Sequence, residues 1–417
     1  MLHTDAMHDS MTYAEKFDVI VVGGGPAGLS AAAVSARRGA KTLVLEKSRE
    51  IGYPVKTSGG SFVRDLHALG IPDNLYHPVH RIRLVSGEST AVFEYREPTF
   101  CVVDIRGLWQ YLAENAAANG ASLRCGSKVL APVVHDGVVQ GVKYADPDGH
   151  VAKVGAELTI DASGMSAVIA RSVGLNAGFR RYGVGSEFEI YAPDFDQDEV
   201  VLAYGSEFAP CGYGWAFPRG NARVRVGVGL IHPDTQLDSL ERARAFYVRL
   251  RERLGLAADW SVLEIHAGVV PSEGVQQQLV KGKVMIAGDS AGHASCLAGE
   301  GIRFAIAAGR AAGRAAAAAA LGSTTEPLMR YQQDWLAKHG EMYRIAYRMN
   351  RALVKLTDSE WDEYVRLASS FTASEFAQIL HGDFRRVATR MIRSPRRALK
   401  LLRVAREILA LAERRDG

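Results

Sequence analysis

Two uninterrupted apolar runs, each followed by a small-residue segment of helical character, dominate the hydrophobic pattern of the chain. Val19–Val22 leads into Ala31–Ala36, and Val284–Ala287 leads into an alanine-rich stretch that ends near Gly322. A further apolar run, Thr42–Leu45, follows the first helical segment. Such runs are typical of buried strands in a parallel sheet, because helices cover both faces of that sheet. The pattern therefore predicts strand–helix–strand units of an α/β fold.

A different pattern extends over residues 213–229, where apolar and small or polar positions alternate and aromatic rings gather. The stretch YGWAFPRGNARVRVGVG has Tyr213, Trp215 and Phe217 at every second position, so a strand would project all three rings to one face. Gly227 and Gly229 share one face of the next strand and remove side chains where a ligand or a ring would collide. We expect an antiparallel sheet whose aromatic face lines either a substrate tunnel or the core.

The first strand and helix are joined by Gly23, Gly25 and Gly28 in GxGxxG spacing. In a dinucleotide-binding unit the first glycine permits the tight turn, the second lets the pyrophosphate approach the backbone, and the third lets helix pack on strand. The helix N-terminus offers free N–H groups to the phosphates. Glu46 follows the second strand and is placed to accept the ribose hydroxyls. The order of these elements is that of a dinucleotide site rather than of a structural glycine turn.

The second strand–turn–helix unit indicates which dinucleotide binds. Gly288 and Asp289 end the strand, and an aspartate there can bind the ribityl chain of a flavin. Gly299 and Gly301 precede the long helix and would let backbone N–H groups face the pyrimidine edge of the isoalloxazine. A second α/β crossover without a ligand is the alternative. Together with the first motif, this unit favours FAD.

From about residue 17 to residue 322 the chain resembles FAD-dependent oxidoreductases of the para-hydroxybenzoate hydroxylase type. The resemblance implies a flavin or pyrophosphate contact for Arg106, which precedes a predicted helix. It also places Asp161 where the hydroxylases carry an Asp-Gly pair that serves FAD and NADPH. Here Ser163 precedes Gly164, and this DASG form is more similar to flavin halogenases and isoprenoid reductases.

The aromatic stretch is similar to the PxxYxWxFPx(7–8)GxG pattern of geranylgeranyl reductases. The matching residues are Pro210, Tyr213, Trp215, Phe217, Pro218, Gly227 and Gly229. The resemblance implies hydrogenation of C=C bonds in a polyprenyl (geranylgeranyl-type) chain on a lipid, quinone or diphosphate, with these residues from Tyr213 onward binding the substrate. The family's cysteine near the flavin falls on Thr57 or Ser58, so Thr57, Ser58 or a bound water is expected to relay the proton. Cys296 stands where the family carries proline.

The expected cofactor is FAD, with NADPH or ferredoxin as the external reductant. The residues expected to contact FAD are Gly23, Gly25, Ala27, Gly28, Glu46, Lys56, Gly59, Arg106, Val129, Asp161, Gly288, Asp289, Gly299, Gly301 and Ile302. The alternative functions are a flavin-dependent monooxygenase or halogenase of the same superfamily, in which Lys56 would lie near the flavin. A non-redox lycopene-cyclase-like enzyme and a prenyl-lipid binding protein are further alternatives.

These assignments predict the domain organisation. We expect a Rossmann-type FAD-binding domain in three pieces, an inserted antiparallel β-sheet substrate domain and a helical C-terminal region, so the fold is α/β locally and α+β overall. The expected FAD-binding domain comprises residues 15–65, 98–180 and 262–322, the substrate domain 66–97 and 181–261, and the helical region 323–417.

Positive charge is concentrated at the C-terminus. Residues 383–417 carry 11 Lys/Arg and 4 Asp/Glu, whereas the whole chain has a net charge of +4. Arg396, Lys400 and Arg403 form one stripe of a predicted helix whose apolar stripe suits docking either on the protein itself or on anionic lipid. Nucleic acid is not an expected partner, because no aromatic residues interleave with the basic ones.

Composition argues against several other classes of protein. The cysteines lack CxxC spacing, so neither a disulfide framework nor a zinc site is expected: Cys101, Cys125, Cys211 and Cys296. Four histidines lack metal-ligand spacing and are expected at the surface or as caps: His77, His80, His266 and His293. The sequence shows no secretory signal and no apolar run of about 18 residues that would span a bilayer. We expect a cytoplasmic protein, peripheral at the inner face of the cell membrane if the basic helix binds lipid.

Overall fold

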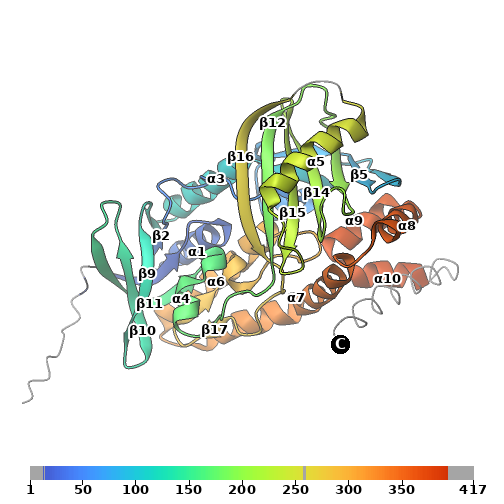
Figure 1. Cartoon of the computed structure of the whole chain (residues 1–417). Coiled ribbons are helices and arrows are strands. Elements are labelled where there is room, and N and C mark those ends of the chain that lie inside the picture. Colours follow the sequence, from blue (N-terminus) through green and yellow to red (C-terminus); the bar gives the residue numbers. More distant parts are fainter. Residues whose placement is uncertain (1–12, 14, 257–259, 393–417) are drawn as a thin grey trace, which may run out of the picture.

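The computed structural model describes residue 13, residues 15–256 and residues 260–392. Within these residues the strands form an eight-stranded, a seven-stranded and a three-stranded sheet. Figure 1 shows the eight-stranded sheet with its helices at the left, the seven-stranded sheet standing beside it, and the long helix α7 (Glu326–Leu353) running beneath both. The predicted basic helix with Arg396, Lys400 and Arg403 lies outside the described residues.

The eight-stranded sheet carries the predicted nucleotide-binding unit. Its strand order is β17-β18-β11-β1-β2-β8, and β10 and β9 extend it beyond β11. β1 pairs in parallel with β2 and with β11, as the uninterrupted apolar runs predict. The strands are β1 (Lys16–Val22), β2 (Thr42–Leu45), β8 (Ser122–Arg124), β9 (Lys128–His135), β10 (Val138–Ala145), β11 (Val151–Asp161), β17 (Val280–Lys281) and β18 (Val284–Ile286).

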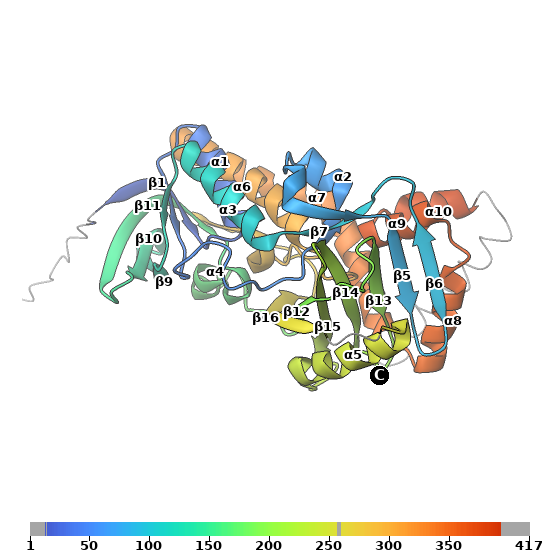
Figure 2. The ribbon, with the colours of Figure 1, turned by 90° about the horizontal axis from the view of Figure 1, so that it is seen from above.

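Closely packed helices cover this sheet (Figure 2). They are α1 (Pro26–Arg37), α3 (Ile105–Ala118), α4 (Val168–Ser172) and α6 (Ile302–Gly322). The close approach of α6 to α1 requires glycine on α6: a Cβ on Gly309 or Gly313 would lie 2.1 or 2.2 Å from the carbonyl oxygen of Ala27 or Ala31. The alanine-rich helix is therefore a packed part of the fold, as predicted.

The seven-stranded sheet forms the second body, and helix α5 (Ser239–Leu254) covers one of its faces (Figure 1). Its strand order is β16-β12-β15-β14-β13-β5-β6, with only the β13–β5 pair parallel. The strands are β5 (Arg81–Val85), β6 (Thr90–Glu94), β12 (Tyr182–Tyr191), β13 (Glu199–Ala203), β14 (Gly212–Gly220), β15 (Arg223–His232) and β16 (Ser261–Pro271). The predicted antiparallel sheet around residues 213–229 is confirmed, since β14 and β15 form its centre.

A small sheet and a set of helices complete the fold. The sheet has β7 (Phe100–Val103) between β3 (Gly60–Phe62) and β4 (Tyr76–Val79), and α2 (Val63–Ala68) follows β3. After α7 come α8 (Asp358–Ala368), α9 (Ala373–His381) and α10 (Phe384–Ile392). The ring of Phe376 on α9 stacks on Phe93 of β6 at a centroid distance of 4.0 Å, so this helical region packs on the face of the seven-stranded sheet that carries Trp215 and Phe217.

The predicted fold class is confirmed, but one predicted domain boundary is wrong. Residues 262–322 were assigned to the FAD-binding domain, yet β16 pairs with β12 along its length and belongs to the seven-stranded sheet. β16 is an edge strand with most of its side chains exposed, so it lacks the continuous apolar run that marks the buried strands of a Rossmann sheet. The substrate domain therefore extends to about Pro271.

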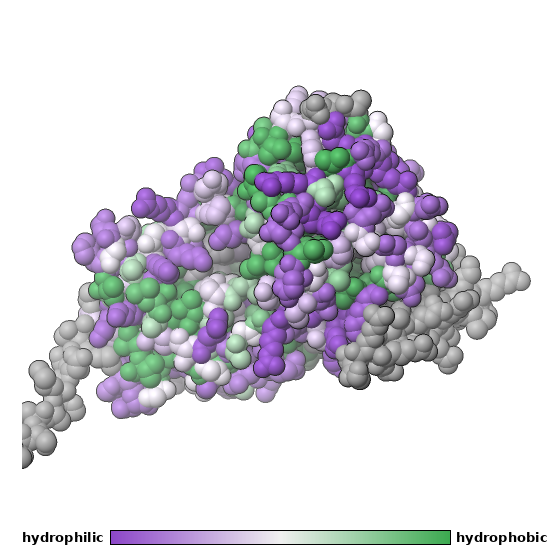
Figure 3. All heavy atoms as spheres, in the orientation of Figure 1, coloured by the Kyte–Doolittle hydropathy of each residue, from purple (hydrophilic) through white to green (hydrophobic). Residues whose placement is uncertain are grey.

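The surface is mostly polar with some apolar areas. Figure 3 shows apolar side chains over the region of β9–β11 and over the upper part of the seven-stranded sheet. On β16 the side chains of Val262, Ile265 and Val269 are exposed. Among the described helices, none combines the length and the apolarity needed to cross a membrane.

Candidate functional site

The three glycines between β1 and α1 have three different surroundings. Gly23 has a φ of +107°, and a Cβ there would lie 2.4 Å from the carbonyl oxygen of Ala162. A Cβ on Gly28 would lie 2.0 Å from the carbonyl oxygen of Gly23, so α1 packs directly on the turn. No protein atom lies within 4 Å of a Cβ built on Gly25. The turn is closed at its two ends and open at its centre, where a phosphate would approach.

Glu46 lies beside this turn at the carboxyl end of β2. Its Oε2 accepts a hydrogen bond of 2.6 Å from the N–H of Gly24, and its Oε1 accepts one of 2.7 Å from the N–H of Ser48. Each carboxylate oxygen keeps a second lone pair. The side chain is thus oriented by the backbone, and its binding of ribose hydroxyls stays a prediction.

The second glycine-rich unit follows β18. Asp289 has no hydrogen-bond partner for its carboxylate among the described residues, and burial raises its pKa to about 6. A Cβ on Gly299 would have only the Tyr213 hydroxyl nearby, at 3.8 Å, and one on Gly301 would lie 3.4 Å from the Cβ of Ala294. A carboxylate without a partner beside uncrowded backbone is an arrangement that polar hydroxyls of a ligand would complete.

Asp161 requires a correction. It is 0% exposed, and its carboxylate accepts hydrogen bonds from the N–H and hydroxyl of Ser163 and from the N–H groups of Ile169 and Ala170. These bonds anchor the turn after β11 to the first turn of α4. With no exposed surface, the carboxylate positions this turn rather than contacting a cofactor directly.

Two further expected cofactor residues lie on the surface of the site region. The Arg106 guanidinium is exposed, forms an ion pair with Glu50 and lies 6.0 Å from the centre of the Tyr53 ring. The Lys56 side chain is also exposed, although its carbonyl oxygen would lie 2.0 Å from a Cβ on Gly268 of β16. Neither side chain has a geometry that identifies a ligand, so both roles stay predictions.

Four other expected cofactor residues are buried. They are Ala27, Gly59, Val129 and Ile302. The side chain of Ala27 packs on Gly288, where a Cβ would lie 2.8 Å away. Ala27 lies in the first turn of α1, where backbone N–H groups have no acceptor within the helix. Contacts from these residues would therefore come from the backbone, and they too stay predictions.

The face of the seven-stranded sheet away from α5 carries the three rings. Tyr213, Trp215 and Phe217 form a row with centroid distances of 5.6 and 6.0 Å. The Trp215 indole lies across β15: a Cβ on Gly227 would be 2.8 Å from it, and one on Gly229 would be 3.3 Å from it. The glycines therefore make room for the ring, which is one of the two explanations that the sequence left open.

Pro218 lies on the opposite face and is a second correction. Side chains alternate along β14, so Pro218 projects to the same side as Gly214, which packs on the Phe246 ring of α5. It pairs with Val224 in the core under α5. A direct substrate contact from Pro218 is therefore wrong, because the alternation of the strand turns it away from the other rings.

A buried ionic network surrounds the Trp215 indole. The indole N–H donates a hydrogen bond of 2.9 Å to Glu187, whose other oxygen lies 2.9 Å from His266 Nδ1. His266 Nε2 lies 3.0 Å from Glu264, a side chain that is 47% exposed. The chain of contacts connects solvent to the ring. Burial alone would lower the pKa of His266, but its hydrogen bonds to Glu187 and Glu264 outweigh burial and raise it.

Arg225 links this network to the loop before β3. It is 1% exposed, and its Nε donates a hydrogen bond of 3.1 Å to Glu189. Its Nη1 donates to the carbonyl oxygen of Ser58 at 2.8 Å. Burial, the larger effect, would raise the pKa of Glu189, yet Arg219 and Arg225 hold it below its usual value. The loop with the predicted hydroxyl relay is thus fixed against the substrate sheet.

Tyr213 joins the same sheet to the second glycine-rich unit. Its hydroxyl donates a hydrogen bond of 2.7 Å to the carbonyl oxygen of Ala298, just before α6. Phe217 reaches the loop before β3, since a Cβ on Gly60 would lie 3.0 Å from its ring. The structure therefore brings together the 56–60 loop, the 298–301 turn and the aromatic face, which are far apart in the sequence.

Thr57 and Ser58 are partly buried in this loop. The structure shows the Ser58 carbonyl engaged by Arg225, while the hydroxyl roles stay predictions. The thiols nearby are poor proton donors or nucleophiles at neutral pH: burial raises the pKa of Cys296 to about 11 and raises that of Cys101 further.

Several residues of the site escaped the sequence analysis. A surface position is wrong for His266 and His293, because both are buried, but His293 Nδ1 accepts a hydrogen bond of 3.2 Å from the N–H of Gly288 and so has the capping role that was the other expectation. Glu187, Arg225 and Glu300 were not considered, although Glu300 receives a hydrogen bond of 2.8 Å from Arg303 beside the 298–301 turn. A usable signal existed: charged residues alternate within the otherwise apolar segments SEFEI and RVRVGV, which is unusual for buried strands.

The residues present fit FAD. The open backbone at Gly25, the unpartnered carboxylate of Asp289 and the uncrowded turn at Gly299 and Gly301 match the phosphates, the ribityl hydroxyls and the ring edge. Within the described residues, the one cluster with metal-ligand geometry is Asp146, Asp148 and His150, in an exposed turn on β10–β11. That turn is part of neither glycine-rich unit.

Two family profiles match the chain. Residues 18–180 match the FAD dependent oxidoreductase family, and residues 183–270 match the geranylgeranyl reductase catalytic domain. The second match contains the sheet strands with Glu187, Trp215, Arg225 and His266. Its end near Pro271 agrees with the corrected domain boundary.

Individual proteins agree with the profiles. The chain is similar to digeranylgeranylglycerophospholipid reductase 2 of Methanothermobacter thermautotrophicus, with 31% identity over 374 residues, covering 87% of this chain and 94% of the relative. A solved geranylgeranyl bacteriochlorophyll reductase-like protein of Thermoplasma acidophilum has a TM-score of 0.79 and 24% identity, covering 87% and 96%. A myxobacterial chondrochloren halogenase, an FAD-dependent enzyme, has a TM-score of 0.63 and 18% identity, covering 88% and 90%. At these identities the two solved structures show the fold alone.

Proposed function

This chain belongs to the geranylgeranyl reductase family of FAD-dependent oxidoreductases, and on that premise we propose how its site works. The protein is an FAD-dependent oxidoreductase that reduces C=C bonds of prenyl chains on lipids. The proposed substrate carries geranylgeranyl-type chains on a glycerophospholipid, as the name of the Methanothermobacter relative suggests. The observation that carries the proposal is the meeting of the aromatic sheet face with the 298–301 turn, through Tyr213, and with the 56–60 loop, through Phe217 and Arg225.

The cofactor is held by backbone and by carboxylates. We place the pyrophosphate at Gly25 and the first turn of α1, the ribose at Glu46, and the ribityl chain at Asp289. Bound FAD, once reduced, supplies the hydride for one carbon of the alkene. The Gly299 N–H is donated to the Ser295 carbonyl oxygen at 2.8 Å, so the N–H groups at the start of α6, from Gly301 onward, would face the electron-rich edge of the ring.

The substrate sheet confines the prenyl chain. A prenyl chain has almost no hydrogen-bonding groups, so it must be held by shape against apolar walls. Tyr213, Trp215 and Phe217 would form one wall, and alignment of reacting atoms by such a wall can lower a barrier by up to about 7 to 11 kcal/mol. Thr57, Ser58 or a water bound between them would deliver the proton to the second carbon.

The function is tested by anaerobic turnover. The protein, reduced with dithionite, is incubated with prenylated glycerophospholipids, prenyl quinones and prenyl diphosphates, and products are weighed by mass spectrometry. A gain of two hydrogens for each bond reduced, greatest on the phospholipid, is the expected result. Trp215→Ala and Phe217→Ala should change the chain-length preference while FAD stays bound. A strict requirement for O₂ would instead support a monooxygenase or halogenase, and an unchanged mass would support a cyclase or a binding protein.

Cofactor binding has its own test in Asp289. The side chain of Asp289→Asn cannot carry the charge that burial disfavours, so the apoprotein should gain stability. Because burial raises the folded pKa of Asp289 to about 6, the wild-type apoprotein loses stability as pH rises from about 4 to 6, and the gain should be complete above that range. FAD affinity should fall by about 10- to 100-fold, the value of a hydrogen bond to a charged group. Equal FAD affinity in both proteins would remove Asp289 from the site.

The proposal also includes a reductant and a membrane contact. NADPH or ferredoxin is the proposed reductant, and anaerobic bleaching of the flavin absorbance by each donor separates them. The basic segment with Arg396, Lys400 and Arg403, for which the sequence predicts a helix, is proposed to hold the enzyme at the inner face of the membrane. Truncation after Ser394 should then lower sedimentation with anionic vesicles, and unchanged sedimentation would favour docking of the helix on the protein itself.

A further inference from the structure

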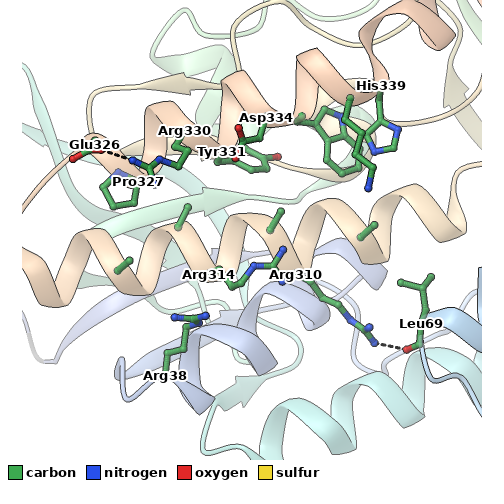
Figure 4. A pocket seen from close by; sticks show the side chains of 16 residues that line it. Arg38, Leu69, Arg310, Arg314, Glu326, Pro327, Arg330, Tyr331, Asp334 and His339 are labelled. Carbon is green, nitrogen blue, oxygen red and sulfur yellow. Dashed lines mark hydrogen bonds and ion pairs between the residues drawn. The ribbon is translucent and has the colours of Figure 1, made fainter.

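A groove lies between α6 and α7 on the outside of the FAD-binding domain, with a cavity volume of about 820 Å³. Its floor is a row of small side chains on α6: Ala307, Ala311, Ala315 and Ala318. Tyr331 and Trp335 of α7 form one wall, and Figure 4 shows Arg310 and Arg314 on α6 with Arg38 beyond them. The groove therefore has an apolar floor under a charged rim.

The rim has more positive than negative charge. Its lining contains five cationic side chains, Arg38, Arg310, Arg314, Arg330 and Lys338, and two carboxylates, Glu326 and Asp334. Arg330 pairs with Glu326 at 2.6 Å. Arg38, Arg314 and Lys338 have no ion-pair partner within the part of the chain that the structure describes. His339 adds no charge at neutral pH, because burial, Lys338 and Arg303 lower its pKa to about 4.

Arg310 shows that these charges crowd one another. Its guanidinium is partly buried and donates a hydrogen bond of 2.7 Å to the carbonyl oxygen of Leu69 rather than to a carboxylate. Burial lowers its pKa, and the nearby Arg37 and Arg314 lower it further. A group of cations that outnumbers its counter-charges favours the binding of an anion, since each unbalanced positive charge is stabilised by a negative charge at close range.

Exposed apolar side chains lie at the end of the same helix pair. Leu321 in the last turn of α6 is 55% exposed, and Met329 in the first turns of α7 is 43% exposed. Leu321 lies one turn from Ala318 of the groove floor, and Met329 is adjacent to Arg330. Apolar side chains beside a cationic rim are typical of surfaces that rest on a membrane, with the cations at the headgroups.

The groove is distinct from the nucleotide site. Arg38 caps the C-terminus of α1, whereas the glycine turn lies at the N-terminus of the same 12-residue helix. At 1.5 Å per residue the two ends are about 18 Å apart. The groove therefore cannot serve the FAD phosphates.

We propose that the α6–α7 groove binds an anionic phospholipid of a membrane surface, with the phosphate among Arg38, Arg310 and Arg314 and an apolar chain along the alanine floor. This proposal goes beyond the reductase function and does not depend on it. The alanine floor favours a lipid over an acidic protein, because a protein surface would satisfy the cations but leave a narrow apolar groove unfilled.

The test uses the full-length FAD-bound protein with phosphatidylcholine vesicles that contain or lack phosphatidylglycerol. Arg310→Gln combined with Arg314→Gln should weaken binding to the anionic vesicles by about 30-fold, since each cation near such a surface contributes about 1 kcal/mol. The matched control is Arg249→Gln combined with Arg253→Gln, which removes two exposed arginines at the same spacing from α5. The control should bind the vesicles as the wild type does.

A variant that keeps every charge separates the groove from general surface charge. Ala311→Phe fills the floor and should also weaken binding, while FAD content and circular dichroism stay unchanged. The proposal is overturned if the arginine variant binds like the wild type, if the α5 control loses as much, or if Ala311→Phe binds normally. It is also overturned if the arginine variant keeps vesicle binding but loses binding to ferredoxin, an acidic protein.

Discussion

At two places in this protein, glycines leave space beside the backbone where a side chain would otherwise lie. The two spaces differ in what occupies them. In the turn before α1, Gly25 leaves space that no atom of the described residues fills, its two chain neighbours aside. In the substrate sheet, Gly227 and Gly229 leave space that the Trp215 indole fills. The two motifs look alike in sequence, because each has two glycines two residues apart next to an apolar strand. The spacing of glycines in the sequence therefore indicates where space is left beside the backbone, but not whether a ligand or a side chain occupies it.

The two regions also differ in how charge is handled. Asp289 beside the glycine-rich turn has a carboxylate with no hydrogen-bond partner among the described residues, so this carboxylate is available to a ligand. In the sheet, Glu187 and Glu189 are saturated by Trp215, His266 and Arg225. Available groups suit binding, whereas saturated groups hold other side chains in position. Substitutions in the glycine turn should therefore affect FAD binding, whereas substitutions in the sheet should affect the positions of other side chains.

The largest effect is expected from Gly28→Ala. A Cβ there would lie 2.0 Å from the Gly23 carbonyl oxygen. This oxygen belongs to the backbone of the turn and cannot rotate away as a flexible side chain could. We expect α1 to separate from the glycine turn at a cost of about 3 kcal/mol or more, at the upper end for overpacked sites. Thermal unfolding of the apoprotein measures it. A variant that melts with the wild type would show that α1 does not pack as described.

A smaller loss is expected from Gly227→Ala. Its Cβ would lie 2.4 Å from the Cβ of Glu187 and 2.8 Å from the Trp215 indole, so the ring and the buried network must shift. We expect a loss of about 1 to 3 kcal/mol in unfolding free energy and a change in prenyl chain preference, with FAD retained. Gly229→Ala is the matched control, because its Cβ would meet only the ring, at 3.3 Å. Equal losses of unfolding free energy at both positions would contradict the described position of the Trp215 indole over Gly227.

Gly25→Ala should have the opposite effect, with nearly unchanged stability and weaker FAD binding. The Gly25 φ of −82° is open to alanine and no protein atom lies nearby, so apoprotein stability should change by less than about 0.5 kcal/mol. The methyl group should instead obstruct the pyrophosphate and lower FAD affinity by about tenfold, or about 1.4 kcal/mol. Flavin titration of the apoprotein measures this. Unchanged affinity would place the phosphates elsewhere.

The smallest effect is a pH dependence in the sheet. Hydrogen bonds to Glu187 and Glu264 raise the folded-state pKa of His266, so its protonation stabilises the fold. That contribution is complete below the ordinary pKa of about 6.5 and is lost as pH rises through the raised value. His266→Gln should therefore abolish the part of the stability decline that falls in that range. An identical pH profile of melting temperature in both proteins would exclude a charged His266.

Much of the fold follows from local pattern in the sequence. The runs Val19–Val22 and Thr42–Leu45, with the glycines between them, predict the parallel strands and the helix, because burial on both faces demands unbroken apolar runs. The alternation of rings from Tyr213 to Phe217 likewise predicts one face of an antiparallel strand. The family resemblance rests on these same local motifs, and the comparisons confirm it.

Only the tertiary structure decided what those motifs contact. The predicted domain of the strand with His266 and Glu264 is wrong, because the residue pattern of an edge strand does not indicate which strand it pairs with. Pairing of β12 with both β15 and β16 brings Glu187, Arg225 and His266 together from segments as many as 79 residues apart. Contacts of this kind depend on register between strands, and register is fixed by the packing of the whole sheet rather than by any one segment. For the same reason the sequence marked the space at Gly227, while the fold alone determined that Trp215 fills it.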